Sequence, residues 1–232
     1  MQYCAIIKKC AFIGDVTGNT TIGGVIGAIW QGGTLENCYH IGSVSALKTE
    51  SNHIGGIVGR LAVGEYTGNN ITVKNCYNVG KVTGISNSIG SIVGDMTHSH
   101  RVDDNEISVD NCYAIKGDVS GNISGNYTTN YDVTELSENM MRNVANKLGG
   151  AFVKNPDINF NNGYPVFTWQ IKAIGDVNGD GVFNKLDVVI LQKWLLSDSS
   201  VTLKNWKNAD LCEDNRLDAF DLVMMKKQLI GK

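Results

Sequence analysis

A twelve-residue stretch near the C-terminus, "DVNGDGVFNKLD" at residues 176–187, carries oxygen-bearing side chains at fixed intervals. A hard cation such as Ca²⁺ binds six to eight oxygens, and a loop of this length supplies them from places 1, 3, 5, 7, 9 and 12. Gly181 occupies the sixth place, where such a loop turns sharply. We predict a calcium site with these ligands: Asp176, Asn178, Asp180, the Val182 carbonyl, Asn184 and Asp187.

A second stretch, "DLCEDNRLDAFD" at residues 210–221, departs from the first in two places. Cys212, a soft thiol, stands at the third place, and Asn215 replaces the glycine at the sixth. Matching amphipathic sequences follow both stretches, "VVILQKWLL" and "LVMMKKQLI", so the second is a duplicate and not an accidental acidic turn. We predict that it binds Ca²⁺ more weakly, with water in place of the third ligand. Its protein ligands are Asp210, Asp214, the Arg216 carbonyl, Asp218 and Asp221.

These paired loop–helix units, with Asp at both twelfth places and no entering helix, resemble a type I dockerin over residues 174–232. The resemblance implies a small all-α module of two F-hand units that folds on binding two Ca²⁺ ions. It also implies docking onto a cohesin domain of a scaffoldin in a cellulosome-like complex. The cohesin contacts that it implies are Lys185, Leu186, Gln192, Lys193, Ala219, Phe220, Lys226 and Lys227.

The two recognition pairs differ, Lys-Leu at 185–186 and Ala-Phe at 219–220. We therefore expect one of two docking orientations to dominate. Leu186 and Phe220 are candidate interface anchors, and the alternative is that they pack inside the module.

Residues 1–125, which precede the calcium loops, contain a repeated sequence pattern. "IGGVIGAI", "IGGIVGRL" and "IGSIVGDM" each precede a segment such as "ENCYHIGSVSA" or "KNCYNVGKVTG". The pattern predicts short strands with glycine corners, stacked because one copy cannot bury its own apolar face. Stacking places Cys10, Cys38, Cys76 and Cys112 in an inward row, with disulfides as the less favoured alternative.

The repeats resemble the GLUG-type repeats of bacterial surface and secreted proteins over residues 5–125. The resemblance implies an all-β solenoid of Gly-rich repeats and a secreted, extracellular protein at a cell-surface complex. Because residues 5–18 match only the second half of a repeat, we expect further sequence upstream, including a secretion signal.

Three variable loops, Gln31–Leu35, Ala62–Asn70 and Thr97–Glu106, are the expected contact surface for a glycan or surface protein. The third loop holds His98, His100, Asp103 and Asp104, for which a solvated polar loop is favoured over a metal site.

Residues 126–172 are expected to form a capping segment between the repeats and the calcium loops. Leu136, Met140 and Val144 recur at helical spacing after Thr134, which predicts a helix that Thr134 caps and that ends at Gly149 or Gly150. A strand is predicted at Pro165–Gln170. The domains are thus 1–125, 126–172 and 173–232.

The composition excludes some classes of function. The chain has 232 residues and a net charge of −3, without the clustered basic residues of a nucleic-acid-binding domain. Its apolar runs are too short to span a membrane. The sequence contains no serine-triad, zinc-protease or nucleotide-binding pattern, so we expect no enzyme activity. The alternative is a fragment of a polysaccharide-degrading enzyme whose catalytic domain lies upstream.

Overall fold

A computed structural model of the chain describes residues 5–47, 53–63, 70–84, 88–98, 107–118, 124–125, 131–155, 158–171, 174–212 and 214–230. The chain divides into two compact units, residues 1–168 and 169–232. The first is mostly β and the second is helical. Residues 131–168, which the sequence assigns to a separate capping segment, cluster with the repeats.

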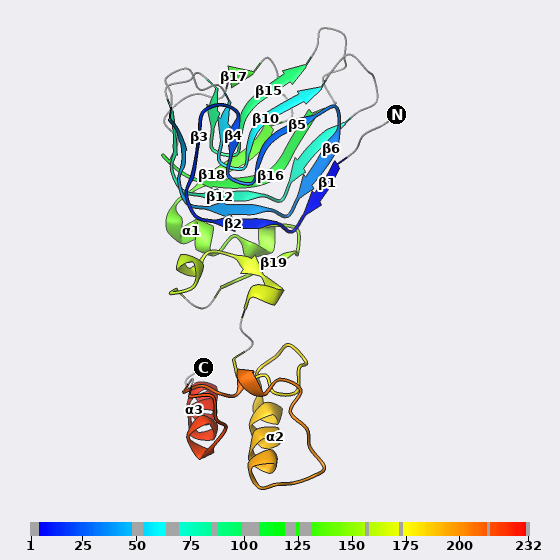
Figure 1. Ribbon diagram of the computed structural model, residues 1–232, viewed down its shortest axis with the longest axis vertical. Coiled ribbons are helices and arrows are strands. Elements are labelled where there is room, and N and C mark those ends of the chain that lie inside the picture. The colour runs from blue at the N-terminus through cyan, green and yellow to red at the C-terminus, as the bar shows by residue number, and fades with distance from the viewer. Residues whose placement is uncertain are drawn as a thin grey trace. The chain divides into compact units, whose positions relative to one another are not determined.

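Unit 1 is built from short strands that stack in parallel layers, and its largest sheet is curled (Figure 1). In order, that sheet contains β1 (Ala5–Lys8), β6 (Gly33–Glu36), β11 (Ile71–Lys74), β16 (Ile107–Ile115), β12 (Tyr77–Val79), β7 (Tyr39–Ile41) and β2 (Ala11–Ile13), with β18 (Tyr131–Leu136) also paired to β16.

Three smaller parallel sheets complete the repeats. The first contains β17 (Ser124–Gly125), β15 (Val93–His98), β10 (Val58–Val63) and β5 (Ile26–Trp30). The second contains β13 (Val82–Thr83), β8 (Val44–Ala46) and β3 (Val16–Gly18), and the third β14 (Ile89–Gly90), β9 (Ile54–Gly55) and β4 (Ile22–Gly23).

The pairing register follows the repeat alignment. Ala11 pairs with Tyr39, Tyr39 with Tyr77, and Tyr77 with Tyr113. These offsets of 28, 38 and 36 residues equal the intervals between Cys10, Cys38, Cys76 and Cys112. The alignment of the repeats in the sequence therefore predicts which strands are neighbours and in which register they pair.

The predicted inward row of cysteines is present in three repeats. Cys38, Cys76 and Cys112 are fully buried, and the described cysteines are free thiols. Cys10 is exposed, contrary to the prediction, because it follows β1 on the outermost layer of the described strands. The thiols pack as small hydrophobic groups, without disulfides among the described cysteines.

The Asn-Cys-Tyr motif has a separate structural role for each residue. Asn37, Asn75 and Asn111 adopt left-handed backbone conformations with φ of 55°, 53° and 49° at the corner before each cysteine. Asparagine tolerates this conformation better than most residues. The Asn111 amide also donates to Oδ1 of Asn75 at 2.7 Å, which links two layers.

The tyrosines of the motif form a second buried row. The Tyr39 and Tyr77 rings stack with centroids 4.9 Å apart, and the Tyr77 hydroxyl donates to the Pro165 carbonyl. The glycines of the other motif allow the layers to approach closely, since a Cβ on Gly56 would lie 2.1 Å from the Ser91 carbonyl oxygen of the next layer.

Each of the three expected loops overlaps a strand. Residues 33–35 of the first loop belong to β6, Ala62 and Val63 of the second to β10, and Thr97 and His98 of the third to β15. The side chains of His98, His100, Asp103 and Asp104 lie outside the described residues, so the polar-loop prediction is not tested there.

The segment after the repeats differs from its prediction. Residues 131–136 form β18, in which Thr134 pairs with Tyr113, so Thr134 is not a helix cap. The helix α1 spans only Glu138–Arg142 with Ser137 at its N-cap, and 3-10 turns follow at Ala145–Lys147 and Asn161–Gly163. The open edge of β16 accepts a strand where the local apolar spacing indicates a helix, since tertiary pairing overrides weak helical propensity.

A small antiparallel pair completes this segment. It contains β19 (Phe152–Val153) and β20 (Val166–Phe167), followed by a 3-10 turn at Thr168–Gln170 within the predicted strand 165–170. Phe152 and Phe167 pack on Tyr39, and α1 and β19 lie along one side of the curled sheet (Figure 1). The segment thus covers the tyrosine row.

Unit 2 contains two helices, α2 (Lys185–Leu195) and α3 (Ala219–Ile230), and a 3-10 turn at Trp206–Asn208. Equivalent positions of the two helices face a shared core, which has Val188, Leu191 and Met225 at its centre. No helix in the described part of the chain is long and apolar enough to cross a membrane.

Candidate calcium sites

The first predicted loop is folded around the carboxylate of Asp176. The Gly179 N–H donates to Oδ1 of Asp176 at 2.7 Å, and the Gly181 N–H donates to Oδ2 at 2.9 Å. Gly181 has a φ of 86°, a conformation that glycine adopts without strain. The glycine at the sixth place therefore turns the backbone back onto the carboxylate at the first place.

The polar groups at the intervening places lie within hydrogen-bond distance of one another. The Asn178 amide donates to Oδ2 of Asp180 at 2.9 Å, and the Asn184 amide donates to the Val182 carbonyl at 3.2 Å. Places 3 and 5, and places 7 and 9, are thus paired. Both amides can also turn an oxygen toward a cation.

The ninth and twelfth places join the loop to α2. Asn184 accepts a hydrogen bond from the Leu186 N–H at 2.7 Å, while its own N–H donates to Oδ2 of Asp187 at 2.9 Å. This reciprocal pair is a capping box. Asp187 is fully buried in the first turn of α2, where the helix dipole stabilises a carboxylate.

The second loop repeats these contacts 34 residues later. The Asn215 N–H donates to Oδ2 of Asp210 at 2.9 Å, and the Phe220 N–H donates to Oδ1 of Asp218 at 2.6 Å. Fully buried Asp221 accepts from the Asp218 N–H at 3.1 Å, as Asp187 does from Asn184. The backbone of the second loop is therefore arranged like that of the first.

The buried carboxylate at the second twelfth place is held in its ionised form. Desolvation alone would raise the pKa of Asp221. Hydrogen bonds from the Asp218 N–H, the Cys212 thiol and the Cys212 and Leu211 N–H groups outweigh it and lower the pKa below its ordinary value. An ionised carboxylate is the form that binds a metal ion.

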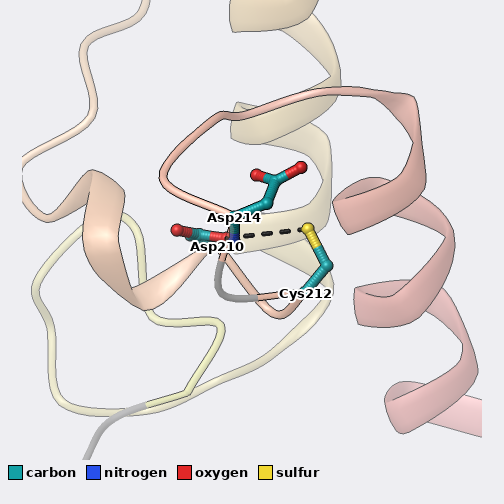
Figure 2. A group of neighbouring side chains, drawn as sticks. All are labelled: Asp210, Cys212 and Asp214. Atoms are coloured by element: carbon teal, nitrogen blue, oxygen red, sulfur yellow. Dashed lines mark hydrogen bonds between the residues drawn. The ribbon is translucent and has the colours of Figure 1, made fainter.

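The third place of the second loop holds a thiol in place of the Asn178 amide, and Figure 2 shows Cys212 beside Asp210 and Asp214. Sγ of Cys212 lies 3.7 Å from Oδ1 of Asp210, and one ligand atom from each of Asp210, Cys212 and Asp214 falls within 4.8 Å of the others. Desolvation and the neighbouring Asp221 and Asp214 carboxylates raise the pKa of Cys212 to about 11. The thiol is therefore protonated at neutral pH and is a poor partner for a hard cation.

The donor set fits calcium better than a soft metal. Loop 1 offers only oxygens, and loop 2 offers oxygens apart from the one thiol. The predicted ligand sets contain three carboxylates in the first loop and four in the second. Among the described residues, the structure gathers ligand atoms of Asp210, Cys212 and Asp214, and the remaining ligands stay predictions.

Comparison with protein families gives a match that covers these loops and both helices. Residues 174–230 match the family model described as the dockerin type I domain. Unit 2 contains a type I dockerin domain. Searches of curated proteins and of solved structures gave no significant match.

The dockerin domain implies calcium-dependent attachment to a cohesin in a cellulosome-like system. All eight residues that the sequence analysis assigns to cohesin contact are exposed in unit 2. Leu186 is 53% exposed and Phe220 67% exposed, so these two side chains are not packed inside the dockerin domain.

Two further exposed apolar residues were missed by the sequence analysis. Val189 and Val223 are 47% and 48% exposed, one helical turn after Leu186 and Phe220. Their position could have been predicted, because residues three apart, such as Leu186 and Val189 or Phe220 and Val223, lie on the same face of a helix. Each helix of the dockerin domain therefore presents an apolar pair followed by a lysine, Lys193 or Lys227.

Proposed function

We propose that this chain is a non-catalytic component that attaches through its dockerin domain to the cohesin of a scaffoldin. The repeats serve as a structural or adhesive module. In this account residues 1–125 form a β-solenoid of GLUG-like repeats that residues 126–172 cap, and the protein acts outside the cell. The parallel pairing of successive repeats supports the solenoid.

The observation that carries the attachment function is the duplication of an exposed face. Leu186, Val189 and Lys193 on α2 correspond to Phe220, Val223 and Lys227 on α3, and all are exposed. Isolated exposed apolar residues are common, but the same exposed trio on two helices is the pattern of an interaction surface. Its apolar members are the anchors that we expect a cohesin to cover.

Two calcium ions support this surface, one in each loop. Each twelfth-place carboxylate joins its loop to the first turn of the helix that carries the face, so ion binding and helix position are coupled. The second ion is bound more weakly because Cys212 contributes no oxygen. A water molecule takes the third place there.

The absence of catalysis is tested directly with the whole chain. It is incubated with soluble plant polysaccharides in calcium, and reducing ends are measured over time, with cohesin binding by the same sample as the check that unit 2 is folded. We expect no product above a buffer blank. Release of oligosaccharides would contradict the non-catalytic assignment and leave the attachment function standing.

A further inference from the structure

The outward face of the sheet formed by β5, β10 and β15 carries an exposed indole. Trp30 ends β5, the outermost strand of this sheet, and is 61% exposed. Ala62 of β10 pairs with Trp30 on one side and with Thr97 of β15 on the other. The alternate residues Ile29, Leu61 and Met96 point into the core. The row of Trp30, Ala62 and Thr97 therefore lies on the opposite, outward face.

A polar cluster occupies the adjacent row on the same face. Arg60 pairs in register with Asp95, and its guanidinium carbon lies 5.4 Å from the Trp30 ring centroid. The Arg60 Nη2 group donates to Oγ1 of Thr97 at 3.3 Å. The guanidinium thus orients the indole and connects it to the next two strands.

Asp95 is the centre of the cluster and is only 6% exposed. The Thr97 hydroxyl donates to its Oδ2 at 2.5 Å, and Arg60 Nε and His53 Nδ1 lie 3.2 and 3.3 Å from the same oxygen. All three of these donors approach Oδ2, and a carboxylate has a second oxygen that can accept. The cluster therefore holds a rigid carboxylate with accepting capacity remaining.

Two donors of the cluster lack hydrogen bonds of good geometry. Nδ1 of His53 and Nε of Arg60 are buried, and neither has a hydrogen-bond partner within the described residues, although both approach Asp95. Native structures bury few such groups, and each calls for an explanation. Both atoms face Oδ2 of Asp95 and so fix the position of this carboxylate.

The cluster carries no net charge at neutral pH. The charges of Arg60 and Asp95 cancel. Desolvation lowers the pKa of His53; Asp95 opposes this effect and Arg60 adds to it, so the imidazole is neutral. A surface without net charge favours an uncharged ligand over a charged one, and the exposed Trp30 ring beside polar groups suits a ligand with an apolar face and hydroxyl groups.

We propose that this face, built from Trp30, Arg60, Asp95 and Thr97, binds a neutral polysaccharide. The C–H face of a sugar ring stacks on the indole, which offers a large apolar surface at small entropic cost. Hydroxyl groups at the ring edge donate to Asp95 and accept from Arg60. This inference names the ligand class for the adhesive module and so rests on the proposed function.

The experiment is affinity electrophoresis of the whole chain in calcium through gels containing xylan, glucomannan, mixed-linkage β-glucan or polygalacturonate. We expect at least one of the three neutral polymers to retard the protein more than polygalacturonate does. Replacing Trp30→Ala should weaken that retardation at least about tenfold, and Trp30→Phe should retain part of it. Trp30 is exposed, so both variants are expected to fold.

Trp169→Ala is the matched control, because Trp169 is 70% exposed and lies in unit 2. It should bind the polymer as the unsubstituted chain does. Retardation by none of the neutral polymers, by polygalacturonate alone, or equally for Trp30→Ala and the unsubstituted chain would overturn the proposal. Cohesin binding measured on the same samples tests attachment separately, since Trp30 lies in unit 1.

Discussion

The backbone N–H of Asn215 donates to Oδ2 of Asp210 at 2.9 Å, the same contact and distance that Gly181 makes with Asp176. Asn215 reaches it with a φ of 63°, against 86° for the glycine. The second loop therefore keeps the turn without a glycine. The loss of a ligand oxygen in the second loop occurs at the third place, where Cys212 stands in place of Asn178.

Restoring an oxygen at that place should strengthen the second site. We expect Cys212→Asn to raise the calcium affinity of the second loop by about tenfold, because calcium affinity follows the number and charge of the oxygen ligands. Isothermal titration of the whole chain measures both sites. Cys212→Ala is the control, and it should leave the weaker site unchanged. Two sites of equal affinity in the unsubstituted chain would contradict the role assigned to Cys212.

The two exposed anchors should contribute unequally to cohesin binding. Leu186→Asp and Phe220→Asp each place a charge on one of the two faces, and only the face used in the dominant orientation is desolvated by cohesin. We expect one variant to lose at least about tenfold in affinity and the other much less. Surface plasmon resonance on an immobilised cohesin measures both, and equal losses would contradict a single dominant orientation.

The cysteine row should behave as hydrophobic packing. Cys76 is fully buried with its thiol donating to the Lys74 carbonyl at 3.3 Å. We expect Cys76→Ser to destabilise unit 1 by about 1–2 kcal/mol, since a hydroxyl costs more to bury than a thiol. Cys10→Ser, at an exposed position, is the matched control. A fall in the melting temperature on adding reductant would show disulfides in place of free thiols.

Acid should weaken the stacking of the repeats. The hydrogen bond from the Lys8 ammonium is the main cause that lowers the pKa of Glu36; partial burial opposes it, and Lys74 lowers it further. Because the pKa of Glu36 is lower in the folded protein than its ordinary value of 4.5, the ionised side chain stabilises the fold at pH values above 4.5. This contribution is lost as the pH falls through the pKa of the folded state.

The melting temperature of unit 1 should therefore fall below pH 4.5, and Glu36→Gln should make that fall shallower. Glu138→Gln is the control. Glu138 pairs with Arg142 on the surface, with its side chain 65% exposed, and such pairs contribute little. An identical pH profile for Glu36→Gln and the unsubstituted chain would contradict the stabilising role of this ion pair.

The sequence predicts the register of the repeats and the arrangement of the calcium loops for related reasons. The interval between two motif cysteines gives the number of residues between equivalent corners of successive repeats. The place of a residue in the calcium loop determines whether its oxygen can turn inward. The register and the loop arrangement can therefore both be predicted from residue positions in the sequence. The sequence does not predict β18, because the apolar spacing after Thr134 suits a helix and only the free edge of β16 decides otherwise.

The contacts around Asp95 could not be predicted as fully as the register. Val58 pairs with Ile26 and with Val93, offsets of 32 and 35 residues, which equal the intervals between the motifs that begin at Ile22, Ile54 and Ile89. The alignment of these motifs therefore predicts that Arg60 and Asp95 are neighbours. The contacts that their side chains make with Trp30, Thr97 and His53 emerge only from the folded sheet.

Calcium-dependent cohesin binding is the central claim, and one measurement tests it most directly. The whole chain is titrated onto a panel of immobilised cohesins in calcium, and the titration is repeated after EDTA and after calcium is restored. We expect binding to at least one cohesin, its loss in EDTA, and its recovery with calcium, because the loops order the helices that carry the docking face. Binding that persisted unchanged in EDTA, or no binding to any cohesin in calcium, would contradict the account.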